Sequence, residues 1–269
     1  MRYGLSLPIF GPLADPSTAA RLAAEAENAG WDGVFCWDHV AYGPDVGDIA
    51  DPWVTMAAMA CATERVRLGP MVTPLPRRRP ITLARQVASL DHLSAGRLTL
   101  GVGIGGDGAG ELSGTGEELD ARVRGAMLDE SLALLAQAWS GETVRHRGPH
   151  YVLDGLQVRP VPVQRPGPPV WVALRRGNRA PLRRAARHDG MFPIEVDTPD
   201  QLAELVAQAH AMRSPDAGQF DVAIGGRHGD HTRDPAAYAD AGATWWITSF
   251  SPYDVTVGDV RDALTRLPT

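Results

Sequence analysis

The sequence predicts a single (β/α)8 barrel domain over residues 1–269, and two observations predict it. Short apolar runs of strand length alternate with helical patterns eight times along the chain. Barrels of this kind commonly have roughly 250 residues in one domain, and this chain has 269. Strands that alternate with helices form a parallel sheet, so a doubly wound sheet is the alternative fold.

The predicted strands are short apolar or alternating segments bounded by turn residues. They cover residues 3–7, 33–37, 66–72, 98–103, 170–174, 190–194, 221–225 and 244–248. In a barrel, the C-terminal ends of these strands would meet at one face, where ligands bind.

The predicted helices follow the strands, and three of them begin at an aspartate followed by proline. Asp15, Asp51 and Asp234 each supply a capping oxygen, and proline suits the first helical turn. The helical segments run over residues 15–30, 51–63, 82–93, 118–139, 179–187, 199–212, 234–242 and 257–267. Residues 143–158 break this rhythm and predict a small hairpin, and the proline-rich stretch 160–169 is extended.

Composition and charge exclude several classes of function. The net charge of −6 argues against binding nucleic acid through bulk electrostatics. Since no run of 18 apolar residues and no signal-peptide pattern occurs, we expect a cytoplasmic protein that does not span a membrane. All 26 basic residues are arginine, which excludes a lysine Schiff base. Cys36 and Cys61 lie in apolar surroundings and are expected to be buried thiols.

Asp38 and His39 are the first candidate site residues, because they follow the second predicted strand directly. In a parallel α/β protein the C-terminal end of a strand is where ligands bind. A histidine there can donate to a carbonyl or ring nitrogen of a cofactor, and an aspartate can fix its tautomer or cap a turn. The alternative is a solvated loop pair.

Three further segments at strand ends are candidates for ligand binding. Residues 69–74 contain glycine and prolines that permit close approach of a ligand, although an ordinary tight turn is the alternative. Residues 101–108 have a Gly-x-Gly pattern but lack the helix that a dinucleotide fingerprint requires directly afterwards, so bare backbone against a flat ring is preferred. Residues 174–179 bring arginines to a helix start, which suits phosphate, and a basic surface turn is the alternative.

The arginine clusters and the histidine pair elsewhere in the chain are not predicted to form ligand sites. The arginines at 77–79 and 183–184 are expected to be solvated or paired at the surface. The histidines at 228 and 231 lie in a short polar loop without a second cluster, so no metal site is predicted.

Taken together, the motifs of this chain resemble the bacterial luciferase-like monooxygenase family, a group of flavin- or deazaflavin-dependent oxidoreductases. Trp37-Asp38-His39 belongs to the resemblance, and so do the segments 3–8, 24–33, 63–69, 73–80, 84–97, 101–103, 139–141, 168–173 and 184–190. Their order and spacing are more specific than any one of them. The resemblance implies a (β/α)8 barrel with short insertions over the C-terminal face.

The resemblance also implies a cofactor, either reduced FMN or the deazaflavin coenzyme F-420, and it does not decide between them. The implied catalytic residues, facing the ring, are His39 and Asp38. The residues implied to back the ring, where the family often has a non-prolyl cis peptide, are Pro70, Met71 and Val72. Those implied to pass along the ring or its chain are Gly103, Gly105 and Gly106, and those implied to hold the phosphate are Arg176, Gly177 and Asn178. Trp37, Trp53, Met71 and Phe192 are expected to form apolar walls.

The chain departs from the family pattern near the Gly-x-Gly motif. Deazaflavin-dependent dehydrogenases of this family have a glutamate soon after it, whereas Gly106 and then Asp107 stand here. His39 is therefore the leading residue for proton handling. We expect an oxidoreductase, favouring a monooxygenase acting on a small organic substrate. The alternative is a non-catalytic flavin-binding or regulatory protein, and a metal- or lysine-dependent isomerase or aldolase is disfavoured. A separate flavin reductase and a homodimer are the partners that the resemblance suggests.

Overall fold

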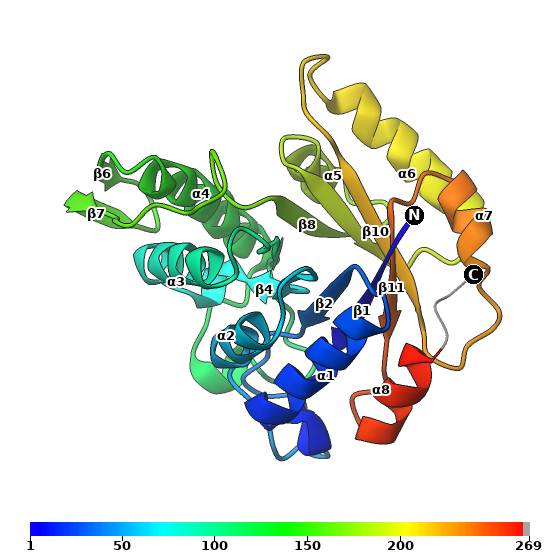
Figure 1. Cartoon of the computed structure of the whole chain (residues 1–269). Coiled ribbons are helices and arrows are strands. Elements are labelled where there is room, and N and C mark those ends of the chain that lie inside the picture. The colour runs from blue at the N-terminus through cyan, green and yellow to red at the C-terminus, as the bar shows by residue number, and fades with distance from the viewer. Residues whose placement is uncertain (266–269) are drawn as a thin grey trace.

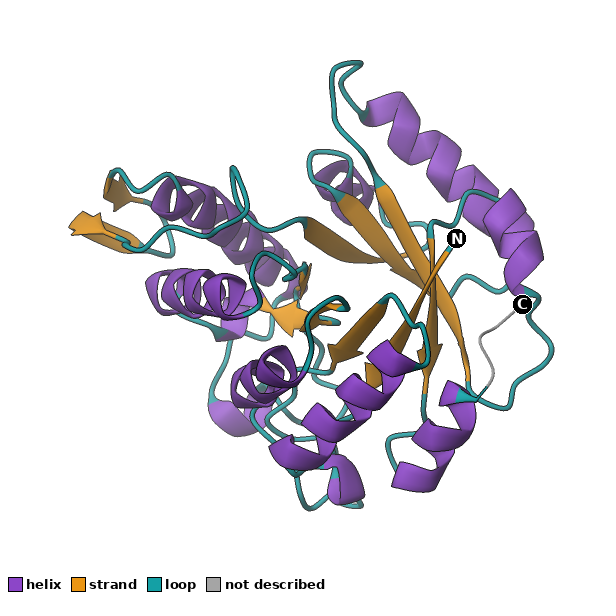
Figure 2. Ribbon diagram, in the orientation of Figure 1, coloured by secondary structure: helices purple, strands orange, loops and turns teal. Residues whose placement is uncertain are grey.

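The computed structural model describes residues 1–265, and its centre is a sheet of parallel strands surrounded by helices (Figures 1 and 2). The strands occur in the order β3-β2-β1-β11-β10-β9-β8-β5-β4. Their bounds are β1 (Arg2–Leu7), β2 (Gly33–Cys36), β3 (Arg67–Pro70), β4 (Thr73–Pro74), β5 (Leu100–Gly103), β8 (Val170–Arg175), β9 (Gly190–Ile194), β10 (Asp221–Arg227) and β11 (Trp245–Ser249).

The strands β3 and β4 are two parts of one barrel strand, interrupted by a cis peptide between Met71 and Val72. β3 pairs with β2 and β4 pairs with β5, so the two ends of the sheet order are joined through the same segment. A parallel bridge between Leu68 and Leu98 also links the two sides. The sheet therefore curves into a nearly closed barrel. The predicted (β/α)8 fold is confirmed, and the doubly wound alternative is wrong.

The helices cover the outside of the barrel, as Figure 2 shows. They are α1 (Pro16–Asn28), α2 (Pro52–Ala62), α3 (Pro80–Leu93), α4 (Ala121–Trp139), α5 (Arg179–Ala185), α6 (Pro199–Met212), α7 (Pro235–Asp240) and α8 (Val257–Leu264). None of the helices within residues 1–265 combines the length and the apolar character that crossing a bilayer requires.

The helix boundaries differ from prediction where local capping decides them. The helix predicted from residue 118 begins at Ala121, because the Asp120 side chain accepts hydrogen bonds from the backbone N–H groups of Arg122 and Val123. The helix predicted over 179–187 ends at Ala185. The predicted end of the last helix, residue 267, lies outside the described residues.

The predicted hairpin over residues 143–158 is confirmed as β6 (Thr143–Arg147) and β7 (Val152–Gln157), which pair antiparallel. It projects from the barrel beside α4 (Figure 1).

Apolar side chains fill both the barrel interior and the space between the sheet and the helices. The interior cluster comprises Phe35, Met71, Trp171, Ala223, Trp245 and Ile247. Cys36 is buried as predicted, but Cys61 is exposed. The expectation for Cys61 was wrong because it lies near the end of α2, on the side of the helix opposite the buried residues Met56, Met59 and Ala60.

Candidate active site

A cavity of about 650 Å³ opens at the C-terminal ends of the barrel strands. Of the residues predicted for the site, those that line it are Asp38, His39, Met71, Val72, Gly103, Gly105, Gly106 and Asn178. Pro70, Arg176 and Gly177 are not among the described lining residues. The structure thus brings together most of the predicted positions at the predicted face, and the roles assigned to them stay predictions.

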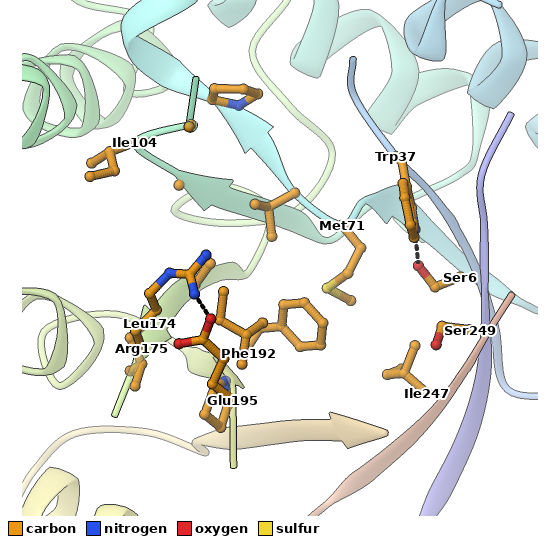
Figure 3. A pocket seen from close by; sticks show the side chains of 18 of the residues that line it. Ser6, Trp37, Met71, Ile104, Leu174, Arg175, Phe192, Glu195, Ile247 and Ser249 are labelled. Atoms are coloured by element: carbon orange, nitrogen blue, oxygen red, sulfur yellow. Dashed lines mark hydrogen bonds and ion pairs between the residues drawn. The ribbon is translucent and has the colours of Figure 1, made fainter. Parts of the chain in front are cut away.

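The walls of the cavity are mainly apolar, and Figure 3 shows Met71, Phe192 and Ile247 directed towards it. The indole of Trp37 also lines the cavity, and its Nε1 donates to Ser6 Oγ at 3.0 Å. Trp53 does not belong to the described lining. Its ring lies 5.6 Å from Arg78 Cζ, so it supports an arginine instead of forming a wall.

The buried Asp38 carboxylate is held by neighbours other than the His39 ring. It accepts hydrogen bonds from the Thr73 hydroxyl and from Arg77, and Arg78 donates to it at 2.9 Å from Nε and 2.8 Å from Nη2. Arginines 77 and 78 were expected at the surface. Instead, only 5% of the Arg77 side chain is exposed, because it faces two buried carboxylates. Asp38 therefore anchors the segment that follows the cis peptide.

The second carboxylate belongs to Glu111, which lies next to His39 and is only 2% exposed. Glu111 Oε2 is 3.1 Å from His39 Nδ1. Glu111 Oε1 accepts from the backbone N–H of Val40 at 2.6 Å and also from Arg77. Arg77 thus joins Asp38 to Glu111, and these three residues fix the backbone and the imidazole of the His39 segment.

Glu111 is a site residue that the sequence motifs did not predict. Position 106 indeed lacks a glutamate, but the loop places the Glu111 carboxylate in the cavity lining. His39 and Glu111 are 72 positions apart, and Glu111 lies in an irregular loop. No periodic pattern in the sequence therefore indicates this contact. The available signal was that Glu111-Leu112 is an acid–apolar pair interrupting a run of small and polar residues.

The pKa of Glu111 lies below its ordinary value despite its burial. Burial alone raises the pKa, but hydrogen bonds from His39 and from the Val40 N–H, together with the charges of His39 and Arg77, outweigh it. In the neutral imidazole, Nδ1–H donates a hydrogen bond to the ionised Glu111 carboxylate, so the ring carries its hydrogen at Nδ1. Nε2, which has no hydrogen bond to residues 1–265, is then the acceptor nitrogen of the ring.

The loop that carries Glu111 is tied at both ends. Asp107 Oδ1 accepts from the backbone N–H groups of Leu112 and Ser113 at 2.8 and 2.9 Å. Arg124, buried on α4, donates to the carbonyl oxygens of Ile104, Glu118 and Leu119. These contacts set the path of the loop and therefore the position of the carboxylate.

The predicted phosphate segment, residues 174–179, also contributes to the cavity lining. Arg175 lines the cavity and pairs with Glu195 (Figure 3), whereas Arg176 points to Glu204 on α6 at 3.7 Å. Asn178 is the N-cap of α5, and its side chain makes no capping hydrogen bond within the described chain. Arg175 and Arg233 are the arginines among the described lining residues, and the phosphate-holding role of Arg176, Gly177 and Asn178 stays a prediction.

The residues present fit a flavin-type cofactor. The volume falls within the roughly 300–1,000 Å³ typical of ligand pockets. Gly106 has no atom within 4 Å of the place where a Cβ would stand. The part of the cavity next to Gly106 is therefore open for a flat ring. Apolar walls and two arginines, Arg175 and Arg233, complete the set. In the part of the chain that the structure describes, no group of three or more His, Cys, Asp or Glu residues is arranged to hold a metal ion.

Comparisons with known proteins agree with the barrel fold. The family described as luciferase-like monooxygenase matches residues 1–263. An F420-dependent hydroxymycolic acid dehydrogenase of Mycobacterium tuberculosis is 34% identical over 76% of this chain and 56% of its own length. An F420-dependent glucose-6-phosphate dehydrogenase of Nakamurella multipartita is 34% identical over 77% of this chain and 59% of its own length.

A solved structure of similar fold is the coenzyme F420-dependent tetrahydromethanopterin reductase of Methanopyrus kandleri. It has a TM-score of 0.77 at 16% identity, covering 98% of this chain and 97% of that one. The chain spans less than three fifths of the length of the two dehydrogenases above. The prediction of reduced FMN or the deazaflavin, undecided between them, is consistent with these comparisons. By the match across nearly its whole length, the chain belongs to the luciferase-like monooxygenase family.

Proposed function

We propose that this chain is an oxidoreductase that binds a deazaflavin or FMN in the barrel cavity and transfers hydride between that ring and a small alcohol or carbonyl compound. The observation that carries the proposal is the His39 imidazole lining the cavity with its Nδ1 against the ionised, buried Glu111. Family membership supports an oxidoreductase. The names of two relatives at 34% identity, both F420-dependent dehydrogenases, favour hydride transfer.

When bound, the cofactor ring supplies the atom that accepts or gives the hydride. His39 Nε2 accepts the proton that a substrate hydroxyl loses as its carbon gives up the hydride. The carbonyl product, the reduced ring and a protonated imidazole then balance the reaction. Glu111 stabilises the imidazolium through Nδ1, and the hydrogen bonds from His39 and the Val40 N–H, with the Arg77 charge added, favour the ionised form of Glu111. Met71, Phe192 and Ile247 exclude water from this region.

A monooxygenase using reduced FMN is the second candidate, and membership of a family described by that activity favours it. In this case His39 would donate a hydrogen bond or proton to the oxygen-bearing reactant. A separate flavin reductase would then be needed as a partner to deliver reduced FMN. We also propose a homodimer, as the sequence resemblance implies.

The non-catalytic alternative rests on the short glycine-rich loop and on the lack of a glutamate after Gly-x-Gly, and it is less favoured than turnover. The carboxylate of Glu111 lies beside His39 and supplies the acidic partner that this position lacks.

Reconstitution with each cofactor tests the proposal. The protein is titrated with FMN and with the deazaflavin, and binding is followed by absorbance. The loaded protein is then mixed anaerobically with a panel of alcohols and, in its reduced state, aerobically with aldehydes and ketones. Loss of the oxidised deazaflavin absorbance with an alcohol supports hydride transfer, and oxygen consumption with substrate-dependent product supports monooxygenation. Retention of a cofactor without turnover on either panel supports the non-catalytic alternative, and failure to bind either cofactor contradicts the whole proposal.

A further inference from the structure

Arg233 lines the cavity from the segment between β10 and α7, and the proposed reaction gives it no task. Its Nη2 donates to the backbone carbonyl of Val196 at 2.9 Å. Its Nε is buried and has no hydrogen-bond partner among the described residues. A guanidinium group has five N–H donors, so most of its donor capacity remains for another molecule.

The charge of Arg233 is not neutralised as that of the other lining arginine is. Arg175 forms an ion pair with Glu195, whereas no carboxylate of residues 1–265 lies within 4.0 Å of the Arg233 nitrogens. Asp230 is one of the carboxylate residues close to Arg233 in the sequence. The pKa of Asp230 is lowered mainly by hydrogen bonds from Thr232 and only secondarily by the charge of Arg233. Its carboxylate is exposed and accepts from Thr232.

The guanidinium of Arg233 is also held in place by aromatic rings. Its Cζ lies 4.6 Å from the ring centroid of Tyr238 and 5.9 Å from that of Trp246. Tyr238 is itself fixed, because its hydroxyl donates to the Asp197 carbonyl at 2.8 Å. A cation held by stacking and one backbone hydrogen bond is pre-organised for a ligand, since little side-chain freedom is lost on binding.

We propose that Arg233 is a binding residue for an anionic group of the substrate, a carboxylate or a phosphate monoester, at the β10 side of the cavity. This inference rests on the proposed function, because it names the class of substrate that the oxidoreductase takes. Val196, whose carbonyl accepts from Arg233, lines the same cavity, as do the apolar residues Ile224 and Ile247. The fitting substrate therefore has an apolar body and one anionic end, with the anion on the guanidinium.

The test compares small anions with a neutral molecule of similar shape. Benzoate, phenyl phosphate and benzyl alcohol are titrated calorimetrically into cofactor-loaded and cofactor-free wild-type protein, Arg233→Gln and Arg233→Lys. Arg122→Gln is the matched control, because Arg122 is exposed on α4 and is not among the cavity-lining residues. We expect Arg233→Gln to weaken binding of the anions about 10- to 100-fold, as expected for loss of a charged hydrogen bond. Benzyl alcohol binding should be unchanged, Arg233→Lys should retain part of the anion affinity, and Arg122→Gln should match wild type.

Two results would overturn the inference. The first is equal affinity of wild-type protein for benzoate, phenyl phosphate and benzyl alcohol, which needs no variant and holds even if Arg233→Gln does not fold. The second is weakened FMN or deazaflavin binding in Arg233→Gln with the anion preference intact, because the arginine would then hold the cofactor's phosphate. Failure of wild-type protein to bind either cofactor contradicts the proposed function instead, and the cofactor-free titrations still decide whether Arg233 selects anions.

Discussion

At the scale of single residues, the imidazole of His39 is the group on which the proposed chemistry depends. We predict that His39→Ala lowers kcat by about 10²- to 10⁴-fold, the usual contribution of a positioned acid or base. Cofactor affinity should fall far less than kcat, because most of the expected ring contacts and the expected phosphate contacts come from other segments. Steady-state kinetics and a cofactor titration on the same preparation check this. Full turnover in His39→Ala with bound cofactor would refute its role.

The Glu111 carboxylate gives a pH-dependent prediction. Its pKa is lower in the folded protein than its ordinary value of 4.5. The stabilisation that it provides is therefore fully present above about pH 4.5 and is lost as the pH falls through the folded value. We expect Glu111→Gln to lower the free energy of unfolding by about 1–3 kcal/mol at neutral pH, because Arg77 and the Val40 N–H lose a charged acceptor.

Denaturant unfolding of wild type and Glu111→Gln between pH 7 and pH 3 measures this difference. The gap between the two proteins should shrink as the pH falls below about 4.5. A gap that stays constant across this range would mean that the Glu111 charge does not stabilise the fold.

The candidate site could be predicted where its residues follow strands, and not where they reach it from irregular loops. Asp38, His39, Met71 and Gly103 lie at or just beyond strand ends, so their convergence follows from the barrel itself. Glu111 and Arg233 come from loops whose paths depend on side-chain contacts far along the chain. Arg77 resembled a surface arginine because its two carboxylate partners are not its sequence neighbours.

At the scale of secondary-structure elements, strands were easier to place than helix ends. A buried strand is marked by apolar side chains along its whole length, as Gly33–Cys36 is. The end of a helix depends on single hydrogen bonds, such as those that the Asp120 side chain accepts at the start of α4. The fold could therefore be predicted nearly element by element, while several helix boundaries were off by a few residues.

The loop from β5 to α4 is the element on which the Glu111 position depends. We predict that Arg124→Met destabilises the protein by about 2 kcal/mol or more, because the carbonyls of Ile104, Glu118 and Leu119 lose a buried donor. Hydrogen exchange should accelerate in residues 104–120 before it does so elsewhere. The matched control is Arg122→Met, two positions earlier and exposed. Equal exchange in the two variants would show that Arg124 does not fix the loop.

At the scale of the whole molecule, the barrel depends on close contact where β3 passes the start of β5. A Cβ added at Gly69 would stand 1.8 Å from the Thr99 carbonyl oxygen. Any side chain there would push apart the two strands that close the sheet. Because the packed barrel core is continuous on both sides of the contact between Gly69 and Thr99, the strain should reach every strand and not remain local.

We therefore predict that Gly69→Ala lowers the free energy of unfolding by about 1–3 kcal/mol or more, as a single cooperative shift of the whole transition. Gly108→Ala is the control, since nothing lies within 4 Å of the added methyl group. We predict that the strands and the buried indoles belong to one domain, so denaturant unfolding followed by far-UV circular dichroism and by tryptophan fluorescence should give coincident curves. Two separated transitions in the wild type, or a Gly69→Ala effect on only one of two signals, would contradict a single barrel domain over residues 1–269.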